Sequence, residues 1–546
     1  MCGIFALLNN DSNLFNKKQI QESFTKGSKR GPESSVYKEN YKQQIMGFHR
    51  LAINGLNEVA NQPLTIDNVS LICNGEIYNY KDLYNVIGIK PLSSSDCEVI
   101  IHLYILFGIE YTLNLLDGVF AFVLFDNRNI DYPIVHVARD PYGVRPLYMM
   151  TPLTNLYNQY VFASELKVLS PLYNKKFYYI NHFNPGTYMS LIIDNTDMFK
   201  VITPSTKYTG FQFNLPVSSC EIDVVYYKIW EMLSNAVKKR VVGTTERPIA
   251  CLLSGGLDSS LITALVKRYY NGVLETYSIG MEGSEDLKHA EHVATYLGTK
   301  HTSIILTEDE FFNAIPDVIR AIESYDVTTI RASVGNYLIG KYISENSDAK
   351  VIFNGDGSDE LTGGYLYFHA VPNDLEFDRE CKRLLTDIHA FDVLRSDKCI
   401  SSHGLEPRTP FLDREWVSYY LSIPASIRNP KQKNISEFNK CVEKKLLRNA
   451  FMYCDSTLLP SSILWRRKEA FSDGVSGTHK AWYEVIQDKL RHIALHKTME
   501  SSAELLYYKS IFDKAYPECE HVVPYLWMPR FVNATDPSAR TLNLEY

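Results

Sequence analysis

The sequence predicts two domains of different class: a layered α+β domain first, then an α/β domain built on a doubly wound parallel sheet. Three observations lead to this. The chain has 546 residues, more than one hydrophobic core ordinarily supports. Its first two hundred residues read as short strands and turns, whereas from about residue 248 the order becomes strand, helix, strand, which is typical of a parallel sheet. Between the two, residues 203–216 accumulate Pro, Thr and Gly, so we expect a linker there.

The first domain is expected to hold several short strands and two helices. Gly, Asn, Asp and Pro bound the apolar runs that predict strands, at residues 45–48, 69–73, 119–125, 134–138 and 160–163. Helical patterns cover residues 18–26 and 96–107, and Ser95 is placed to cap the second.

The second domain is expected to alternate strands and helices before a helical end. Strands are predicted at residues 248–253, 275–280, 302–306 and 350–353, with helices at 259–267, 289–297 and 308–323. From about residue 374 the chain reads as mostly helical. The predicted boundaries are therefore 2–202, a linker at 203–216, 217–530, and a tail at 531–546.

Composition excludes several classes of protein. With 45% hydrophobic and 22% charged residues the chain is globular, and its net charge of −7 without a basic block makes nucleic acid an improbable partner. We find no signal peptide and no apolar run long enough to span a membrane, so we expect a cytoplasmic protein without a membrane partner. The ten cysteines show neither a disulfide framework nor zinc spacing, and Cys251 and Cys441 are expected to be small buried hydrophobes.

A glycine-rich stretch, LLSGGLDSS at residues 252–260, lies where the first strand of the second domain becomes a helix. Ser254, Gly255 and Gly256 let backbone amides approach an anion, and the helix that begins near Asp258 and Ser259 directs its positive end to the same place. The stretch predicts a pyrophosphate site, with a plain glycine-rich turn as the alternative. The Gly-Lys-Ser/Thr loop of other nucleotide sites is absent, which argues against γ-phosphate hydrolysis.

A second strand runs into an acidic loop at residues 351–360, VIFNGDGSDE. Its carboxylates at Asp356, Asp359 and Glu360, together with Asp258, are ligands of the kind that Mg²⁺ prefers beside phosphate. The alternative is a calcium-like or merely solvated acidic turn. The pairing with the first loop favours magnesium.

The chain opens MCGIF, with a cysteine directly behind the initiator. Cys2 could be an accidental residue of a strand or part of a targeting peptide. If Met1 is removed, however, Cys2 carries a free α-amine with a pKa of about 8. This amine can act as base for the thiol of the same residue, whose pKa is about 8.5. The sequence then predicts a self-activating nucleophile.

Acyl transfer by Cys2 also needs an oxyanion site and a substrate clamp. Asn74 and Gly75 could donate to an oxyanion, Glu76 and Asp96 could accept from an α-ammonium, and Arg50 could pair with an α-carboxylate. Such a set would bind an amino acid. Taken singly, Arg50 could instead form a surface ion pair and Asn74-Gly75 a hairpin turn.

Motifs along nearly the whole chain resemble two known domains. The first half resembles a class II glutamine amidotransferase, through MCGIF, RGPE (30–33), HRL (49–51), NGEIYN (74–79), SDCEV (95–99), LDGVFAF (116–122), RDPYGVRPLY (139–148) and ASE (163–165). The second half resembles the synthetase domain of the glutamine-dependent asparagine synthetases. Its motifs are LLSGGLDSS, SYDVTTIRAS (324–333), NGDGSDELTGGYLYFH (354–369), EPRTPFLD (406–413), WRRKEAFSDGV (465–475) and DPSAR (536–540).

The resemblance implies an N-terminal-nucleophile α/β/β/α sandwich, an ATP pyrophosphatase domain and a reaction at two sites. Cys2 would release ammonia from glutamine through a thioester. Aspartate would take AMP from ATP on its β-carboxylate, and ammonia arriving through an interior tunnel would displace AMP to give asparagine. The implied substrates are glutamine, aspartate and ATP, with Mg²⁺ as cofactor. A homodimer is compatible with the sequence, which does not determine the oligomeric state.

The resemblance also assigns residues to each site. Glutamine binding falls to Arg50, Leu51, Ala52, Ile53, Asn54, Asn74, Gly75, Glu76 and Asp96. ATP and diphosphate binding falls to Leu252, Ser254, Gly255, Gly256, Asp258, Ser259, Ile279, Asn354 and Gly355, and Mg²⁺ to Asp258 and Asp359. The catalytic residues would be Cys2, Asn74, Gly75, Asp356 and Lys468. Taken alone, a lysine in a basic quartet such as Lys468 is more often solvated surface.

One departure from the family pattern matters. Asp356 stands where the family usually has a glutamate that is important for adenylation. The side chain is shorter by roughly an ångström, enough to misplace a catalytic contact, so adenylation could be slower or the site rearranged. Two other hypotheses stay open: a related synthetase that adenylates another carboxylate, and a catalytically silent regulator that binds glutamine or ATP.

Overall fold

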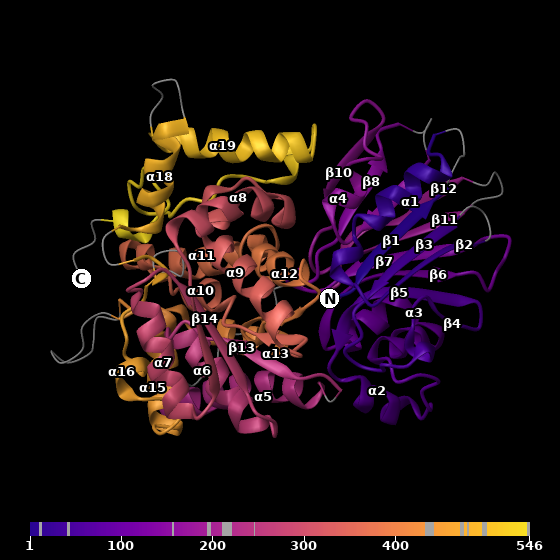
Figure 1. Ribbon diagram of the computed structural model, residues 1–546. Coiled ribbons are helices and arrows are strands. Elements are labelled where there is room, and N and C mark those ends of the chain that lie inside the picture. The colour runs from indigo at the N-terminus through magenta and orange to yellow at the C-terminus, as the bar shows by residue number, and fades with distance from the viewer. Residues whose placement is uncertain are drawn as a thin grey trace.

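The computed structural model places two bodies side by side, the first coloured indigo to magenta and the second magenta to yellow (Figure 1). It describes residues 1–9, 14–40, 44–154, 158–193, 198–209, 221–244, 246–431, 442–469, 474–477, 480–493 and 500–542. The amino terminus lies where the two bodies meet (Figure 1).

The first body contains two antiparallel six-stranded sheets. One has the order β10-β8-β9-β1-β3-β2, from β1 (Gly3–Leu8), β2 (Ser34–Asn40), β3 (Gln44–Arg50), β8 (Tyr148–Pro152), β9 (Tyr160–Ala163) and β10 (Tyr178–His182). The other has the order β12-β11-β7-β6-β5-β4, from β4 (Leu64–Ile66), β5 (Val69–Ile77), β6 (Gly118–Asp126), β7 (Ile134–Arg139), β11 (Thr187–Ile193) and β12 (Phe199–Lys207).

Side-chain alternation along β1 explains how these sheets are stacked. Phe5 and Leu7 pack on the side of α1 (Lys17–Thr25) and α4 (Leu166–Leu169), whereas Ile4, Ala6 and Leu8 pack against the second sheet. On the far side of the second sheet lie α2 (Tyr80–Ile87) and α3 (Val99–Leu115). The result is a four-layer α/β/β/α sandwich, which confirms the predicted class.

One helical stretch, Asp96–Leu115, is long and apolar enough by length and composition to cross a membrane, a test that core helices also pass. Half of it is buried, and residues 99–103 lie in the core. Gly108 has φ +77° and interrupts the helix. Its packing is that of a core helix. The predicted cap is wrong, because the Ser95 side chain makes no capping hydrogen bond.

The second body is built on a five-stranded parallel sheet of order β15-β14-β13-β16-β17. Its strands are β13 (Ile249–Leu252), β14 (Glu275–Gly280), β15 (Lys300–Ile305), β16 (Val351–Phe353) and β17 (Glu406–Arg408). The chain runs outward from β13 through β14 to β15 and then returns to β16 on the other side of β13. This reversal creates a switch point at the carboxyl end of β13, where parallel sheets bind ligands.

Helices cover both faces of this sheet, as a doubly wound fold requires (Figure 1). The face that carries Cys251 and Phe353 packs against α5 (Ile222–Val242), α6 (Leu257–Tyr269), α7 (Glu285–Leu297), α13 (Arg414–Ser422) and α15 (Lys445–Cys454). The opposite face packs against α8 (Glu308–Ile322), α9 (Val327–Asn346), α12 (Asp392–Ser401), α18 (Trp482–Ile493) and α19 (Glu500–Ala515). The other helices of this body are α11 (Asp374–Asp387) and the short α10 (Ser358–Thr362), α14 (Ala425–Arg428) and α16 (Ser461–Leu464).

The predicted strands and helices are confirmed to within a few residues, except that the helix expected at residues 96–107 continues to Leu115. Residues 203–207 belong to β12, which pairs with β11, so that part of the predicted linker is a strand. The remainder of the linker from residue 210 lies outside the described residues, as do Cys441 and residues 543–546 of the tail. The helices α2, α5 and α9 and the strands β2, β4, β8, β10, β11 and β17 were not predicted.

Buried ion pairs join the two bodies. Arg30 of the first is completely buried and lies 2.7 Å from Asp397 of α12. The carboxylate of Glu323, after α8, accepts hydrogen bonds from the backbone of Leu166 at 2.7 Å and Lys167 at 2.8 Å. Because buried charges are costly unless they are paired, these contacts favour one position of the first body relative to the second.

Candidate functional site

A cavity of about 210 Å³ opens at the carboxyl ends of β13, β14 and β16, next to the switch point of the sheet. The predicted ATP, diphosphate and metal residues that line it are Leu252, Ser254, Gly256, Asp258, Ser259, Ile279, Asn354, Gly355, Asp356, Asp359 and Lys468. Gly255, in the same loop, is not among the lining residues. The two glycine-rich loops, a hundred residues apart in sequence, therefore meet at one pocket.

The first loop is held tightly where β13 becomes α6. Gly255 has φ +70°, and a Cβ there would lie 2.5 Å from the backbone of α7, at Ala290, so this position requires glycine. The Ser259 hydroxyl lies 3.0 Å from that of Ser254 and accepts from the Ser254 backbone amide at 3.2 Å. The loop thus presents hydroxyl and amide donors at the start of a helix, an arrangement suited to an anion.

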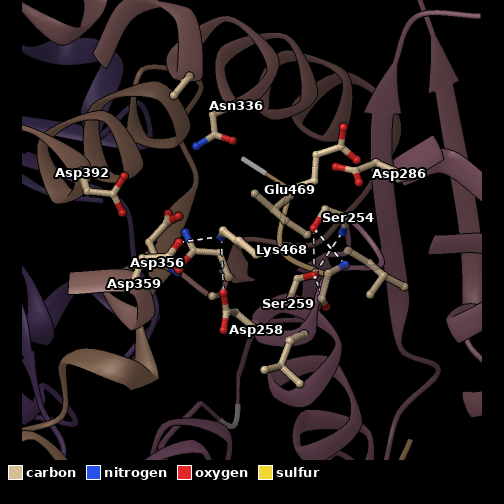
Figure 2. Close-up of a pocket in the computed structure, with 18 of the residues that line it drawn as sticks. Ser254, Asp258, Ser259, Asp286, Asn336, Asp356, Asp359, Asp392, Lys468 and Glu469 are labelled. Carbon is tan, nitrogen blue, oxygen red and sulfur yellow. Dashed lines mark hydrogen bonds and ion pairs between the residues drawn. The ribbon is translucent and has the colours of Figure 1, made fainter. Parts of the chain in front are cut away.

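Two lysines lie between the acidic residues on the other side of the pocket. The Lys468 ammonium is 2.6 Å from Asp359 and 3.8 Å from Asp258, and Figure 2 shows it pointing between them. Burial would raise the pKa of Asp359, but the adjacent Lys444 and Lys468 hold it well below its usual range. The solvated-surface alternative for Lys468 is therefore wrong.

Lys444 was not predicted. It lies just before α15, and its ammonium is 2.6 Å from both Asp258 and Asp359. No motif around residue 444 pointed to the site, because the position depends on how α15 packs and not on a local pattern.

The other two acidic residues of the second loop do not join this cluster. Asp356 lies 3.1 Å from Arg395 of α12, which also pairs with Asp392. The Glu360 carboxylate accepts from the Tyr365 hydroxyl at 2.5 Å, and burial raises its pKa well above the ordinary value. Of the four carboxylates considered from the sequence, Asp258 and Asp359 are the pair that lies within reach of one cation.

The predicted glutamine site lies in the first body, facing the second. The Cys2 thiol, just before β1, donates to the Leu51 carbonyl at 3.5 Å. Met1 is completely buried, and its ammonium donates to Leu405 in the second body at 3.1 Å. In the chain that carries Met1, burial raises the pKa of the Cys2 thiol to about 11, although the nearby ammonium opposes this. Removal of Met1 stays a prediction.

Asn74 and Gly75 lie within β5, opposite Ala121 and Phe120 of β6, so the hairpin-turn alternative is wrong. The Asn74 side chain is fully buried, and neither atom of its amide group has a partner among the described residues. A Cβ at position 75 would lie 2.6 Å from the Val119 carbonyl, so glycine is required there. An unpaired buried amide is costly, and it is therefore a candidate for binding substrate.

The predicted substrate clamp is partly occupied by protein groups. Glu76 accepts from Asn54 at 2.9 Å, and Asp96 accepts from the Ile77 backbone at 2.6 Å. Burial raises the pKa of Asp96 to about 6. The Arg50 guanidinium donates to Asn61 at 2.8 Å and to the Asn57 carbonyl at 3.0 Å, so it is not the surface ion pair considered as an alternative.

The segment after β3 forms a wall of this site. Leu51, Ala52 and Ile53 are buried, and the Ala52 amide donates to Glu33 at 2.8 Å. Another residue that the sequence did not reveal comes from the second body: Arg408 of β17 lies 3.2 Å from Glu76. Its EPRTPFLD motif resembled the family, but nothing in the spacing placed it beside the glutamine site.

Family comparisons agree with this division of the chain. The family model described as glutamine amidotransferase domain matches residues 1–200, and the one described as asparagine synthase matches residues 228–376 and 369–535. The asparagine synthetase [glutamine-hydrolyzing] of Gallus gallus is 40% identical over 579 residues, covering 99% of this chain and 98% of the relative. The chain belongs to the glutamine-hydrolysing asparagine synthetase family. The relative of the same description from Homo sapiens is 39% identical over 99% of this chain and 98% of its own length.

Likeness to a solved structure is slight by comparison. An NMN synthetase from Francisella tularensis is 10% identical, with a TM-score of 0.26, and the match covers 56% of this chain and 98% of the other. The assignment to the asparagine synthetases rests on the full-length relatives and on the two domain matches.

Proposed function

We propose that this chain converts ATP, L-aspartate, L-glutamine and water into AMP, diphosphate, L-asparagine and L-glutamate. The observation that carries the proposal is that one chain, similar over its whole length to glutamine-hydrolysing asparagine synthetases, holds both a partly buried cysteine site and a diphosphate-type pocket.

In the first body, Cys2 is the nucleophile for the glutamine amide once Met1 is removed. Its free α-amine takes the thiol proton and delivers it to the leaving ammonia, and water then hydrolyses the thioester to glutamate. The Asn74 side chain and the Gly75 amide are placed to stabilise the oxyanion, because the buried Asn74 amide has no other partner in the described part of the chain. Glu76 and Asp96 bind the substrate ammonium, and the Leu51–Asn54 wall closes around the side chain.

In the second body, the pocket between the two loops binds ATP. The Ser254 and Ser259 hydroxyls and the loop amides bind the diphosphate that leaves, while Leu252, Ile279, Asn354 and Gly355 line the part of the pocket assigned to the nucleotide. The β-carboxylate of aspartate attacks the α-phosphorus, and Lys468 stabilises the charge that develops there. Ammonia then displaces AMP from the β-aspartyl-AMP.

Asp258 and Asp359 fit a magnesium ion. Their oxygens both lie 2.6 Å from one ammonium nitrogen, so they converge on the place of a single cation beside the phosphate loop. When bound there with ATP, Mg²⁺ would neutralise charge on the diphosphate leaving group.

Ammonia has to pass from Cys2 to the ATP pocket without meeting bulk water. The buried residues Arg408 and Glu406 lie beside the glutamine site, where the bodies are in direct contact, and the Arg408 carbonyl also accepts from Asn354 of the ATP pocket. Transfer through this buried contact would keep the nitrogen as ammonia, since protonated ammonium would not attack an acyl group.

A single assay tests the proposal against its rivals. The protein is incubated with ATP, Mg²⁺, aspartate and either glutamine or ammonium, and asparagine, AMP and diphosphate are measured. Asparagine and AMP in equal amounts are expected with both nitrogen sources. Adenylation of a different carboxylate, or no turnover at all, would instead favour one of the two other hypotheses. A cytoplasmic location and a homodimer stay predictions, to be checked by fractionation and by light scattering.

A further inference from the structure

Lys444 occupies an unusual position for a lysine. It is buried, with its side chain 1% exposed, and its ammonium lies 2.6 Å from Asp258, 2.6 Å from Asp359 and 3.2 Å from the Ser358 hydroxyl. Asp258 and Ser358 accept hydrogen bonds from this ammonium, and Asp359 forms an ion pair with it. The residue therefore fills the space between the two carboxylates that are assigned to the metal.

The backbone conformation at Lys444 and the neighbouring Gly364 allow the lysine to reach the two carboxylates. Lys444 has φ +57° and ψ +26°, a left-handed conformation that is uncommon and costly for a residue with a side chain. A Cβ on Gly364 would lie 2.0 Å from Cε of Lys444 and 2.2 Å from Oδ1 of Asp359, so a larger residue there would displace this ion pair. Strain of this kind persists where surrounding contacts over-determine it, and here those contacts are the two carboxylates.

The balance of charges around Lys444 affects how a divalent cation can bind. Asp258 and Asp359 carry two negative charges, which Lys444 and Lys468 neutralise. A divalent cation that enters alone has to displace at least one ammonium and leave a buried positive charge without a partner. Phosphate groups remove this penalty, because they offer the displaced ammonium new oxygens and add negative charge to the site.

We propose that Lys444 is a resident counter-cation: it keeps Asp258 and Asp359 converged and excludes a free divalent cation until phosphate groups arrive. Metal binding is then conditional on the nucleotide. The inference rests on the proposed function for the identity of the site, but it adds a role for a residue outside the motifs.

The test measures Mn²⁺ binding to the full-length protein by electron paramagnetic resonance, with and without inorganic pyrophosphate as the probe. Wild-type protein is expected to bind Mn²⁺ tightly with pyrophosphate and only weakly without it. Lys444→Met is expected to bind Mn²⁺ without pyrophosphate at least about tenfold more tightly than wild type, because the competing charge is gone. Adding Asp359→Asn to that variant should abolish the gain.

A matched control is Lys228→Met, which removes the same charge from the surface of α5, where Lys228 pairs with Glu231. Its Mn²⁺ binding should equal that of wild type. The melting temperature of Lys444→Met should rise on addition of Mn²⁺, whereas that of wild type should not. Lys444→Arg retains a cation, and we expect it to exclude Mn²⁺ as wild type does.

The outcomes separate this inference from the proposed function. If wild type binds Mn²⁺ as tightly without pyrophosphate as with it, or if Lys444→Met gains no affinity, the role proposed for Lys444 is wrong. The assignment of the metal to Asp258 and Asp359 is then unaffected. If wild type binds no Mn²⁺ even with pyrophosphate, the metal assignment of the proposed function is wrong. The wild-type measurements need no variant to fold.

Discussion

The guanidinium of Arg408 lies 3.2 Å from the Glu76 carboxylate, so the edge strand of the second body contacts the predicted glutamine site of the first. The backbone carbonyl of the same Arg408 accepts a hydrogen bond from Asn354 at 3.1 Å, at the start of the acidic loop. One residue therefore touches both candidate sites. Any shift of β17 would therefore move both the Glu76 carboxylate at the glutamine site and the acidic loop of the ATP pocket.

We expect Arg408→Met to impair glutamine use more than ammonium use. Glu76 would lose its ion-pair partner and keep only the Asn54 hydrogen bond, so the KM for glutamine should rise about tenfold or more. Steady-state kinetics with each nitrogen source measure the effect. Lys175→Met is the control, since Lys175 also forms an ion pair between the bodies, with the exposed Glu518 at 2.7 Å. Equal losses in the two variants would contradict a specific role for Arg408.

Replacement of the nucleophile should separate the two half-reactions. In Cys2→Ala we expect glutamine-dependent synthesis to fall by about a thousandfold or more, because no thioester can form, while ammonium-dependent synthesis stays within about threefold of wild type. Mass spectrometry of the wild-type chain should find Met1 absent. Loss of both activities would mean that Cys2 is structural.

The shorter side chain at position 356 should be tolerated. Asp356 already reaches Arg395, at 3.1 Å, so we expect Asp356→Glu to change the adenylation rate by less than about fivefold, and Asp356→Asn to lower it by about a hundredfold. Exchange of labelled diphosphate into ATP, dependent on aspartate, measures this step. A large gain in Asp356→Glu would show that the aspartate is a handicap.

Two neighbouring glycines should respond differently to the same substitution. A Cβ on Gly255 would meet the backbone of α7 at 2.5 Å with φ +70°, whereas the nearest atom to a Cβ on Gly256 is Ser254 Oγ at 3.4 Å. Gly255→Ala should therefore lower the free energy of unfolding by about 1–3 kcal/mol and raise the KM for ATP. Gly256→Ala should have little effect on either. Thermal unfolding and ATP titration give the comparison, and similar behaviour of the two variants would be evidence against the strained loop.

Glutamine hydrolysis should depend on pH through Asp96. Burial raises the pKa of this carboxyl to about 6, so it becomes protonated as the pH falls through that value and can no longer pair with the substrate ammonium. We expect kcat/KM for glutamine hydrolysis to fall below about pH 6, two units above the range of an ordinary aspartate. Asp96→Asn should be slow throughout and lose this limb of the profile. An unchanged profile would assign the limb to another group.

Local patterns were enough for the elements and loops that carry the chemistry. The apolar run of β13 followed by Ser254, Gly255 and Gly256 predicted a strand, a tight turn and a helix, and the structure contains all three. Such features follow from backbone freedom and side-chain periodicity within a few residues, so they can be predicted from the local sequence. Ser95 shows the limit even at this range, because a residue placed to cap a helix does not do so.

By itself, then, the sequence determined the two-domain class and the position of each glycine-rich loop. Only the tertiary structure decided which charges meet: that Lys444 lies between Asp258 and Asp359, that Asp356 pairs with Arg395, and that Arg408 reaches Glu76. The physical reason is that these pairs join segments tens to hundreds of residues apart. Their geometry comes from the packing of α12, α15 and β17 around the sheet, and no local propensity encodes it.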